Sequence, residues 1–150
     1  MIIALVLTVI SMLDYLAKCR SILRFVPGEG KIDDAEAAGE DPVVLSDEII
    51  ARAAALIALA LEKGAKLSTA ESCTGGLIAG SLTAVPGSSS VVEGGVVSYS
   101  NEVKHHLLNV SASDLEHYGA VSEPVAIQMA QGSRSALSTT VAVAVTGVAG

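Results

Sequence analysis

The sequence has 150 residues, of which 51% are hydrophobic, enough for one domain with a buried core. Its formal net charge of −7 argues against a nucleic-acid partner, because binding to phosphates needs a basic face. Two cysteines without C-x-x-C spacing and two adjacent histidines argue against a disulfide framework or a metal site. We therefore expect no metal, no cofactor and a reducing, cytoplasmic environment.

Residues 1–45 are predicted to be an N-terminal extension that ends in a flexible linker. The extension begins with the apolar run MIIALVLTVISML, which is shorter than the ~18 residues typical of a membrane span. The run lacks a basic n-region, so it is a poor secretory signal. Residues 26–42 are rich in Gly, Pro and acidic residues, as linkers are. A membrane anchor is the less favoured interpretation, and the functional body is predicted to span residues 46–150.

Helical and strand patterns alternate along this body. Capping and stop signals, such as Ser46, Gly64, and Ser122 with Pro124, indicate where helices begin and end. The pattern predicts helices at 46–64, 74–85, 101–108, 111–119 and 121–137, and strands at 65–71, 94–100 and from 138 into a final glycine loop. Such alternation is typical of an α/β fold with a mainly parallel sheet covered by helices on both faces.

Polar residues or glycines follow each predicted strand. Ser72, Cys73 and Thr74 follow the first strand, residues 98–104 follow the second, and residues 146–150 follow the third. In parallel α/β sheets, ligands bind at the carboxyl ends of the strands. The three strand ends are therefore expected to converge on one site.

The segment ESCTGG, Glu71 to Gly76, lies where a strand is predicted to lead into a helix. Backbone N–H groups and hydroxyls at a helix start can cradle a phosphate. The segment matches neither the P-loop nor the dinucleotide-binding pattern. A tight turn eased by Gly75 and Gly76, with a Ser or Thr cap, explains it equally well.

Ser72 is a candidate nucleophile, but a serine hydroxyl needs a base and no histidine lies in the segment. Lys104, if desolvated, could take the serine proton, and Tyr99 could relay or orient it. The alternatives are that Lys104 is a solvated helix lysine and that Cys73 is a small buried hydrophobe. Glu71 could orient the lysine, accept a backbone N–H or lie on the surface.

Several motifs in order resemble the C-terminal domain of the CinA family, the competence/damage-inducible proteins, which include the stand-alone nicotinamide-nucleotide amidohydrolase PncC. They are TAESCTGGLIAG, PGSSSVVEGGVVSYSNEVKHHLL, YGAVSEPVAIQMAQG and VAVTGVAG. The resemblance covers roughly residues 49–150. It implies a three-layer α/β/α domain and a homodimer. It also implies that a further strand and helix follow the glycine loop, so the domain is expected to be truncated at its C-terminus.

The resemblance implies deamidation of nicotinamide mononucleotide to nicotinate mononucleotide and ammonia, within pyridine nucleotide salvage. On this reading Ser72 is the nucleophile, Lys104 and Tyr99 assist it, and no metal is needed. The predicted substrate-binding residues are Glu71, Cys73, Thr74, Gly75, Gly76, Asn101, Thr146, Gly147 and Gly150. The alternative is a non-catalytic module that binds a nucleotide or a protein partner.

Overall fold

The computed structural model describes residues 3–6 and 45–148, and this part of the chain contains a parallel four-stranded sheet. The strand order is β1-β4-β2-β3. The strands are β1 (Ile3–Val6), β2 (Leu67–Glu71), β3 (Val92–Val97) and β4 (Val141–Thr146). Strand β2 lies between β3 and β4, so it receives hydrogen bonds along both edges.

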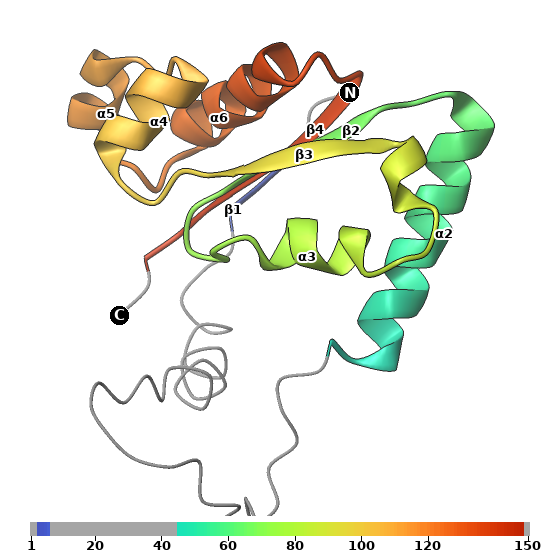
Figure 1. Cartoon of the computed structure of the whole chain (residues 1–150). Helices are drawn as coiled ribbons and strands as arrows, with labels where there is room; N and C mark the ends of the chain where they lie inside the picture. The colour runs from blue at the N-terminus through green and yellow to red at the C-terminus, as the bar shows by residue number, and fades with distance from the viewer. Residues whose placement is uncertain (1–2, 7–44, 149–150) are drawn as a thin grey trace, which may run out of the picture.

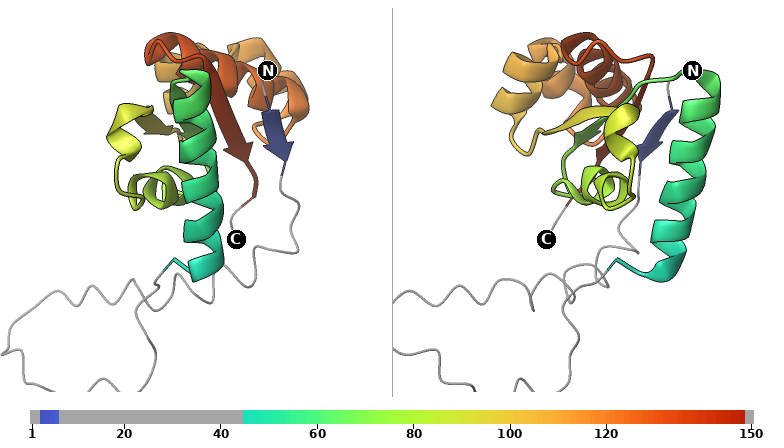
Figure 2. Two further views of the ribbon diagram at one scale, coloured as in Figure 1. Left: turned by 90° about the vertical axis from the view of Figure 1, so that its right-hand side faces the viewer. Right: turned by 45° about the vertical axis from the view of Figure 1, so that its right-hand side comes forward.

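Helices cover both faces of this sheet (Figures 1 and 2). They are α2 (Asp47–Lys63), α3 (Leu77–Thr83), α4 (Asn101–Leu108), α5 (Ala112–Tyr118) and α6 (Glu123–Ala136), with a short 3-10 helix, η2 (Ser88–Ser90). Helices α4, α5 and α6 lie on one face, and α3 and α2 lie on the other (Figure 1). This confirms the predicted three-layer α/β/α architecture.

Most predicted helix ends are where the capping signals put them. The hydroxyl of Ser46 accepts a bond from the N–H of Ile49, and Gly64 ends α2 in the left-handed conformation with φ of 61°. Ser122 is an exception, because its hydroxyl donates to the carbonyl of Gly119 at 2.8 Å instead of capping α6. Helix α3 is shorter than predicted, since Gly75 and Gly76 have positive φ angles and form a turn before it.

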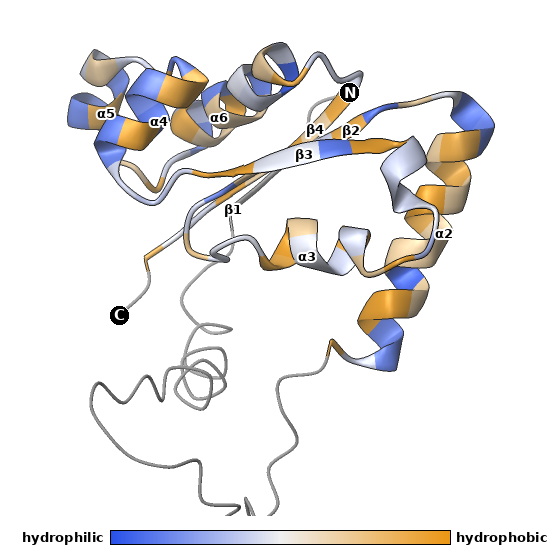
Figure 3. Ribbon diagram, in the orientation of Figure 1, coloured by the Kyte–Doolittle hydropathy of each residue, from blue (hydrophilic) through white to orange (hydrophobic). Residues whose placement is uncertain are grey.

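Side chains alternate between the two faces along β2, as the period of a strand requires. Ser68 and Ala70 face α6, where Ala70 joins the hydrophobic cluster built around α4, α5 and α6. Thr69 and Glu71 face the start of α3. A second cluster joins α2 and α3 to the other face of the sheet. Helices α4 and α5 alternate hydrophilic and hydrophobic residues, as expected for helices with one buried side (Figure 3).

Helix α4 lies unusually close to α6. A Cβ added at Gly132 would overlap the carbonyl group of Leu108, the last residue of α4. A glycine is therefore required at this contact. The close approach holds α4, which carries Lys104, against α6.

Strand β1 was not predicted, because the apolar run at the N-terminus shows no turn signal that would mark a strand. It pairs in parallel with β4, from Ile3 opposite Val143 to Val6 opposite Thr146. The predicted linker at residues 26–42 and most of the apolar run lie outside the described residues. Among the helices that the structure describes, none has the length and apolar character needed to cross a bilayer.

Candidate active site

Ser72 directly follows β2, and the backbone around it is held from both sides. Its N–H donates to the carbonyl of Val145 in β4 at 2.9 Å. On the other side, the N–H of Ser98 donates to the carbonyl of Glu71 at 2.7 Å. The Ser72 side chain is only 6% exposed. By the alternation of β2, it faces the layer of α4 and α6.

Lys104 in α4 reaches this serine. Its Nζ atom donates to the Oγ of Ser72 at 3.0 Å, to the carbonyl of Ser98 at 2.7 Å and to the carbonyl of Tyr99 at 3.2 Å. Lys104 is 1% exposed, so the alternative of a solvated helix lysine is wrong. The predicted meeting of the two side chains across neighbouring strand ends is confirmed.

The surroundings of Lys104 disfavour its charged form. Burial lowers the pKa of the Lys104 ammonium from its ordinary value of 10.5, and the nearby Cys73 sulfur opposes this effect. All three hydrogen-bond acceptors of Nζ among the described residues are neutral: two carbonyls and a hydroxyl. A buried lysine without a carboxylate partner is a suitable proton acceptor.

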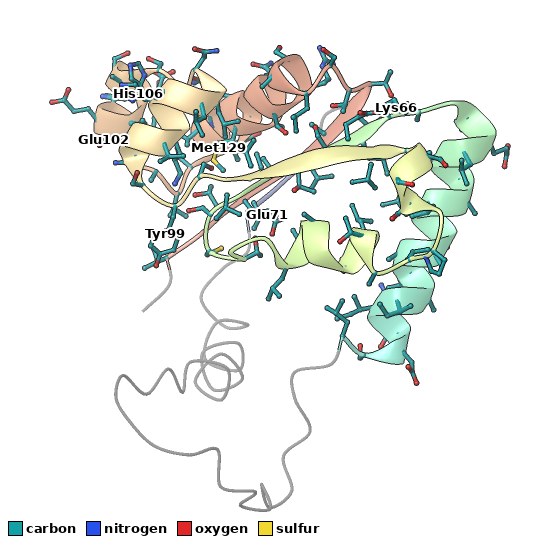
Figure 4. All side chains as sticks on the ribbon, viewed as in Figure 1. Lys66, Glu71, Tyr99, Glu102, His106 and Met129 are labelled. Atoms are coloured by element: carbon teal, nitrogen blue, oxygen red, sulfur yellow. The ribbon has the colours of Figure 1, made fainter. Side chains whose placement is uncertain are left out.

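Glu71 has a different set of partners. Its Oε1 accepts bonds from the hydroxyl of Thr69 at 3.0 Å and the N–H of Ala79 at 2.8 Å. Its Oε2 accepts bonds from the N–H groups of Gly76 and Ile78, both at 3.0 Å. Figure 4 shows Glu71 beside the start of α3. Of the alternatives for Glu71, the structure shows acceptance of backbone N–H bonds.

This arrangement changes the phosphate-cradle hypothesis. The first N–H groups of α3 that a phosphate would use are already bound by the protein's own carboxylate. These N–H groups at the start of α3 are therefore not available to a ligand. Because the N–H of Gly75 donates to the carbonyl of Ser72 at 3.1 Å, any anion held by this segment would have to use the N–H groups of Cys73 and Thr74 instead.

Cys73 lies in the turn and is half-buried. Burial raises the pKa of its thiol from the ordinary value of 9.0, and Glu71 adds to the rise. Bonds from the backbone N–H groups of Cys73 and Thr74 and the charge of Lys104 oppose it. Because only a thiolate is a good nucleophile, Ser72 is the better candidate at neutral pH.

Tyr99 follows β3, which ends at Val97 rather than at the predicted Ser100, and Asn101 is the first residue of α4; both are exposed. Tyr99 is 66% exposed and lies beyond β3 (Figure 4), while its backbone carbonyl contacts Nζ of Lys104. Sequence reasoning missed the carbonyl of Ser98, the nearest acceptor to Nζ. A backbone carbonyl is present in every residue, so residue type does not mark it as functional. Only the position of Ser98 after a predicted strand pointed to a place in the site.

The carboxyl end of β4 also adjoins the site, since Val145 accepts the bond from the N–H of Ser72. Thr146 is fully buried, and its hydroxyl donates to the carbonyl of Ala120 at 2.8 Å. Gly147 is half-buried, and Gly150 lies outside the described residues. The predicted nucleotide contact of this loop therefore stays a prediction.

Histidine, cysteine and carboxylate side chains do not form a metal-binding cluster in the part of the chain that the structure describes. No three of them lie close enough there to hold a metal ion. The Nδ1 atoms of His105 and His106 each contact a backbone carbonyl, of Val110 and Glu102 respectively. The adjacent histidines are thus engaged locally.

The fold and the site define a class of protein: an α/β domain with a buried serine–lysine pair at the carboxyl ends of parallel strands. The model of one family, the CinA C-terminal domain, matches residues 50–150. This chain belongs to that family. The match includes every described residue of the site.

Relatives agree with this assignment. The chain is 54% identical over 98 residues to a CinA-like protein of Parasynechococcus marenigrum, covering 65% of this chain and 23% of the relative. It is 39% identical to a CinA-like protein of Gemmatimonas aurantiaca, covering 85% and 35%. The chain thus spans about a quarter to a third of the length of these curated relatives.

Solved structures show the same fold. One is the competence/damage-inducible protein CihA from Agrobacterium tumefaciens, with 45% identity, a TM-score of 0.67 and coverage of 71% of this chain and 65% of that chain. Another is a competence-damaged protein (CinA) superfamily protein from Escherichia coli, with 36% identity, a TM-score of 0.64 and coverage of 68% and 60%.

Proposed function

We propose that this domain hydrolyses the carboxamide of nicotinamide mononucleotide, releasing nicotinate mononucleotide and ammonia. The observation that carries the chemistry is the contact between the buried Nζ of Lys104 and the Oγ of Ser72 at 3.0 Å. The nucleotide substrate is supported by the resemblance of the motifs to the amidohydrolases of this family. Cytoplasmic location and a homodimer are part of the same proposal.

The geometry around Nζ suits a neutral amine. A neutral lysine has two N–H bonds and one lone pair. The carbonyls of Ser98 and Tyr99 accept the two N–H bonds, which turns the lone pair toward Ser72. In this state the serine hydroxyl donates its proton to Nζ, as a nucleophile does to its base.

The reaction then follows in balanced steps. The Oγ of Ser72 forms a bond to the carboxamide carbon while the hydroxyl proton passes to Lys104. The carbonyl oxygen takes up the electron pair of the C=O double bond and becomes an oxyanion. The oxyanion then re-forms the C=O bond as the C–N bond breaks, and Lys104 returns the proton to the nitrogen, so that ammonia leaves and an acyl-serine remains. Water then attacks the acyl-serine with Lys104 as base, which releases the acid and restores Ser72.

The backbone N–H groups of Cys73 and Thr74 are the candidates for stabilising the oxyanion, since those at the start of α3 bind Glu71 and that of Gly75 binds the carbonyl of Ser72. The phenol of Tyr99 remains the predicted relay for the proton.

Ammonia release from nicotinamide mononucleotide and from NAD, measured on the wild type and on Lys104→Ala, tests the proposal. We expect release from the mononucleotide by the wild type only. Thermal stabilisation by the mononucleotide without ammonia release would support the non-catalytic binding module instead.

A further inference from the structure

We propose that Glu71 is a positioning residue for the nucleophile: from the face opposite Lys104, its carboxylate locks the turn that carries Ser72. This inference rests on the proposed function. It assigns Glu71 to the protein's own backbone, where the sequence predicted a substrate contact.

The placement follows from the alternation of β2. Glu71 and Ser72 are consecutive, so their side chains leave opposite faces of the sheet. Ser72 contacts Lys104 in the layer of α4, α5 and α6, and Glu71 contacts α3 in the layer on the opposite face. The two side chains share one stretch of backbone, which Val145 and Ser98 hold by hydrogen bonds. A shift of this backbone would therefore displace both side chains.

The carboxylate closes the turn onto itself. It binds N–H groups five, seven and eight residues ahead, at Gly76, Ile78 and Ala79. The turn between these anchors contains Ser72 and Gly75, and the N–H of Gly75 donates to the carbonyl of Ser72 at 3.1 Å. Charge-assisted bonds of this kind are about twice as strong as neutral ones.

The turn that carries Ser72 needs bonds of this kind to stay in one conformation. Gly75 and Gly76 have φ angles of 60° and 99°, and glycine gives the chain the most freedom to leave a conformation. Gly76, the residue directly before α3, has no side chain that could cap the helix. Glu71 supplies both the missing cap and the negative charge that a helix N-terminus favours. Without it, three buried or half-buried N–H groups lose their partner.

Glu71 does not act on the reacting atoms directly. Its oxygens face Thr69 and α3, and the acceptors of Nζ among the described residues do not include it. It is 1% exposed, so the carboxylate is not offered to a ligand at the surface. A loss at this position should therefore impair the chemical step more than substrate binding.

The test uses the full chain with Glu71→Gln, which keeps the size of the side chain but removes its charge and one acceptor. We expect kcat to fall about 10- to 100-fold with KM within twofold, because small misplacement of a nucleophile has effects of this order. Hydrogen exchange at Gly76, Ile78 and Ala79 should accelerate. In case the variant folds poorly, Thr69→Val removes a single donor to the carboxylate, and kcat should fall about 2- to 10-fold.

Ser133→Ala is the matched control, because it removes a buried hydroxyl that bonds Ser68 and Thr69 on the other face of β2. We expect this control to keep the wild-type kcat below its unfolding temperature. An equal fall of kcat in both variants would overturn the inference, since it would reflect general destabilisation.

The pKa of Lys104, measured by NMR, separates this inference from the proposed function. If the wild type releases no ammonia, the proposed function fails, but the positioning role is still tested. In Glu71→Gln we then expect this pKa to rise towards 10.5, because a loosened turn admits water to the amine. An unchanged pKa alongside faster exchange at α3 would overturn the inference.

Discussion

Two buried serines lie on the same face of the sheet, Ser68 within β2 and Ser72 directly after it, and their surroundings differ. Ser68 is 2% exposed, and its hydroxyl lies 2.8 Å from the hydroxyl of Thr139 and 3.0 Å from that of Ser133. Ser72 is equally well buried but lies 3.0 Å from an amine. The first serine belongs to a cluster of hydroxyls inside the fold, and the second lies at the strand's carboxyl end.

The comparison shows that burial of a serine does not make it reactive. A hydroxyl bonded only to other hydroxyls and carbonyls has no base beside it, because neither group accepts a proton at neutral pH. Only the strand end brings a helix-borne lysine to the hydroxyl, because α4 begins a few residues after β3 ends.

The largest expected effect separates the two serines directly. Ser72→Ala should lower the rate of ammonia release by at least ~10³-fold, because the covalent route is lost. Ser68→Ala, its partner in the comparison, should retain kcat and only lower the thermal midpoint. Steady-state ammonia assays and circular dichroism melts measure both. A Ser72→Ala protein with near wild-type turnover would end the proposed mechanism.

The next effect tests the amine. Lys104→Met keeps the length of the side chain without a base, and kcat should fall about 10²- to 10⁴-fold. Lys104→Arg is the control that keeps a positive charge but cannot release a proton, so it should be equally inactive. Substantial activity of the arginine variant would mean that charge, and not proton transfer, is what the site requires.

The pH dependence gives a smaller and more specific effect. The proposed base must be neutral, so kcat should rise with pH to a plateau, with a midpoint below 10.5 because burial lowers the pKa of Lys104. Stability should follow the same direction. The folded state holds fewer protons than the unfolded chain between the two pKa values, so the free energy of unfolding rises with pH across that window.

Lys104→Met should abolish this rise in stability, which can be followed by denaturant unfolding at several pH values. A wild-type pH–rate profile that stays flat up to pH 10.5 would contradict a neutral-lysine mechanism.

Local signals in the sequence predicted most of this fold. Ser46, Gly64 and the Val-rich run before Thr146 define a helix and a strand by capping and hydrophobicity, and the structure confirms both. Strand β1 had no such signal, because its pairing with β4 depends on contacts far along the chain. Ser122 keeps the composition of a cap but bonds Gly119 instead.

The site divides in the same way. Strand-end logic predicted that Ser72 and Lys104 meet, because parallel strands bring their carboxyl ends together. The sequence could not decide whether Glu71 orients the lysine, accepts backbone N–H bonds or lies on the surface, since this depends on where the N–H groups of α3 point. It also missed Ser98, whose contribution is a backbone carbonyl. Composition identifies side chains, but contacts of the backbone need the fold.

The smallest effect extends the comparison to a third buried hydroxyl, that of Thr146. This hydroxyl donates to the carbonyl of Ala120, so like Ser68 it is engaged inside the fold. Thr146→Val preserves the shape of the side chain and removes this bond, and we expect a loss of about 1 kcal/mol in the free energy of unfolding. KM for the mononucleotide should stay within twofold, because any contact from this loop would come from its backbone. A tenfold rise of KM at unchanged kcat would instead place the hydroxyl on the nucleotide, and Thr146 would then differ from Ser68 by binding a ligand.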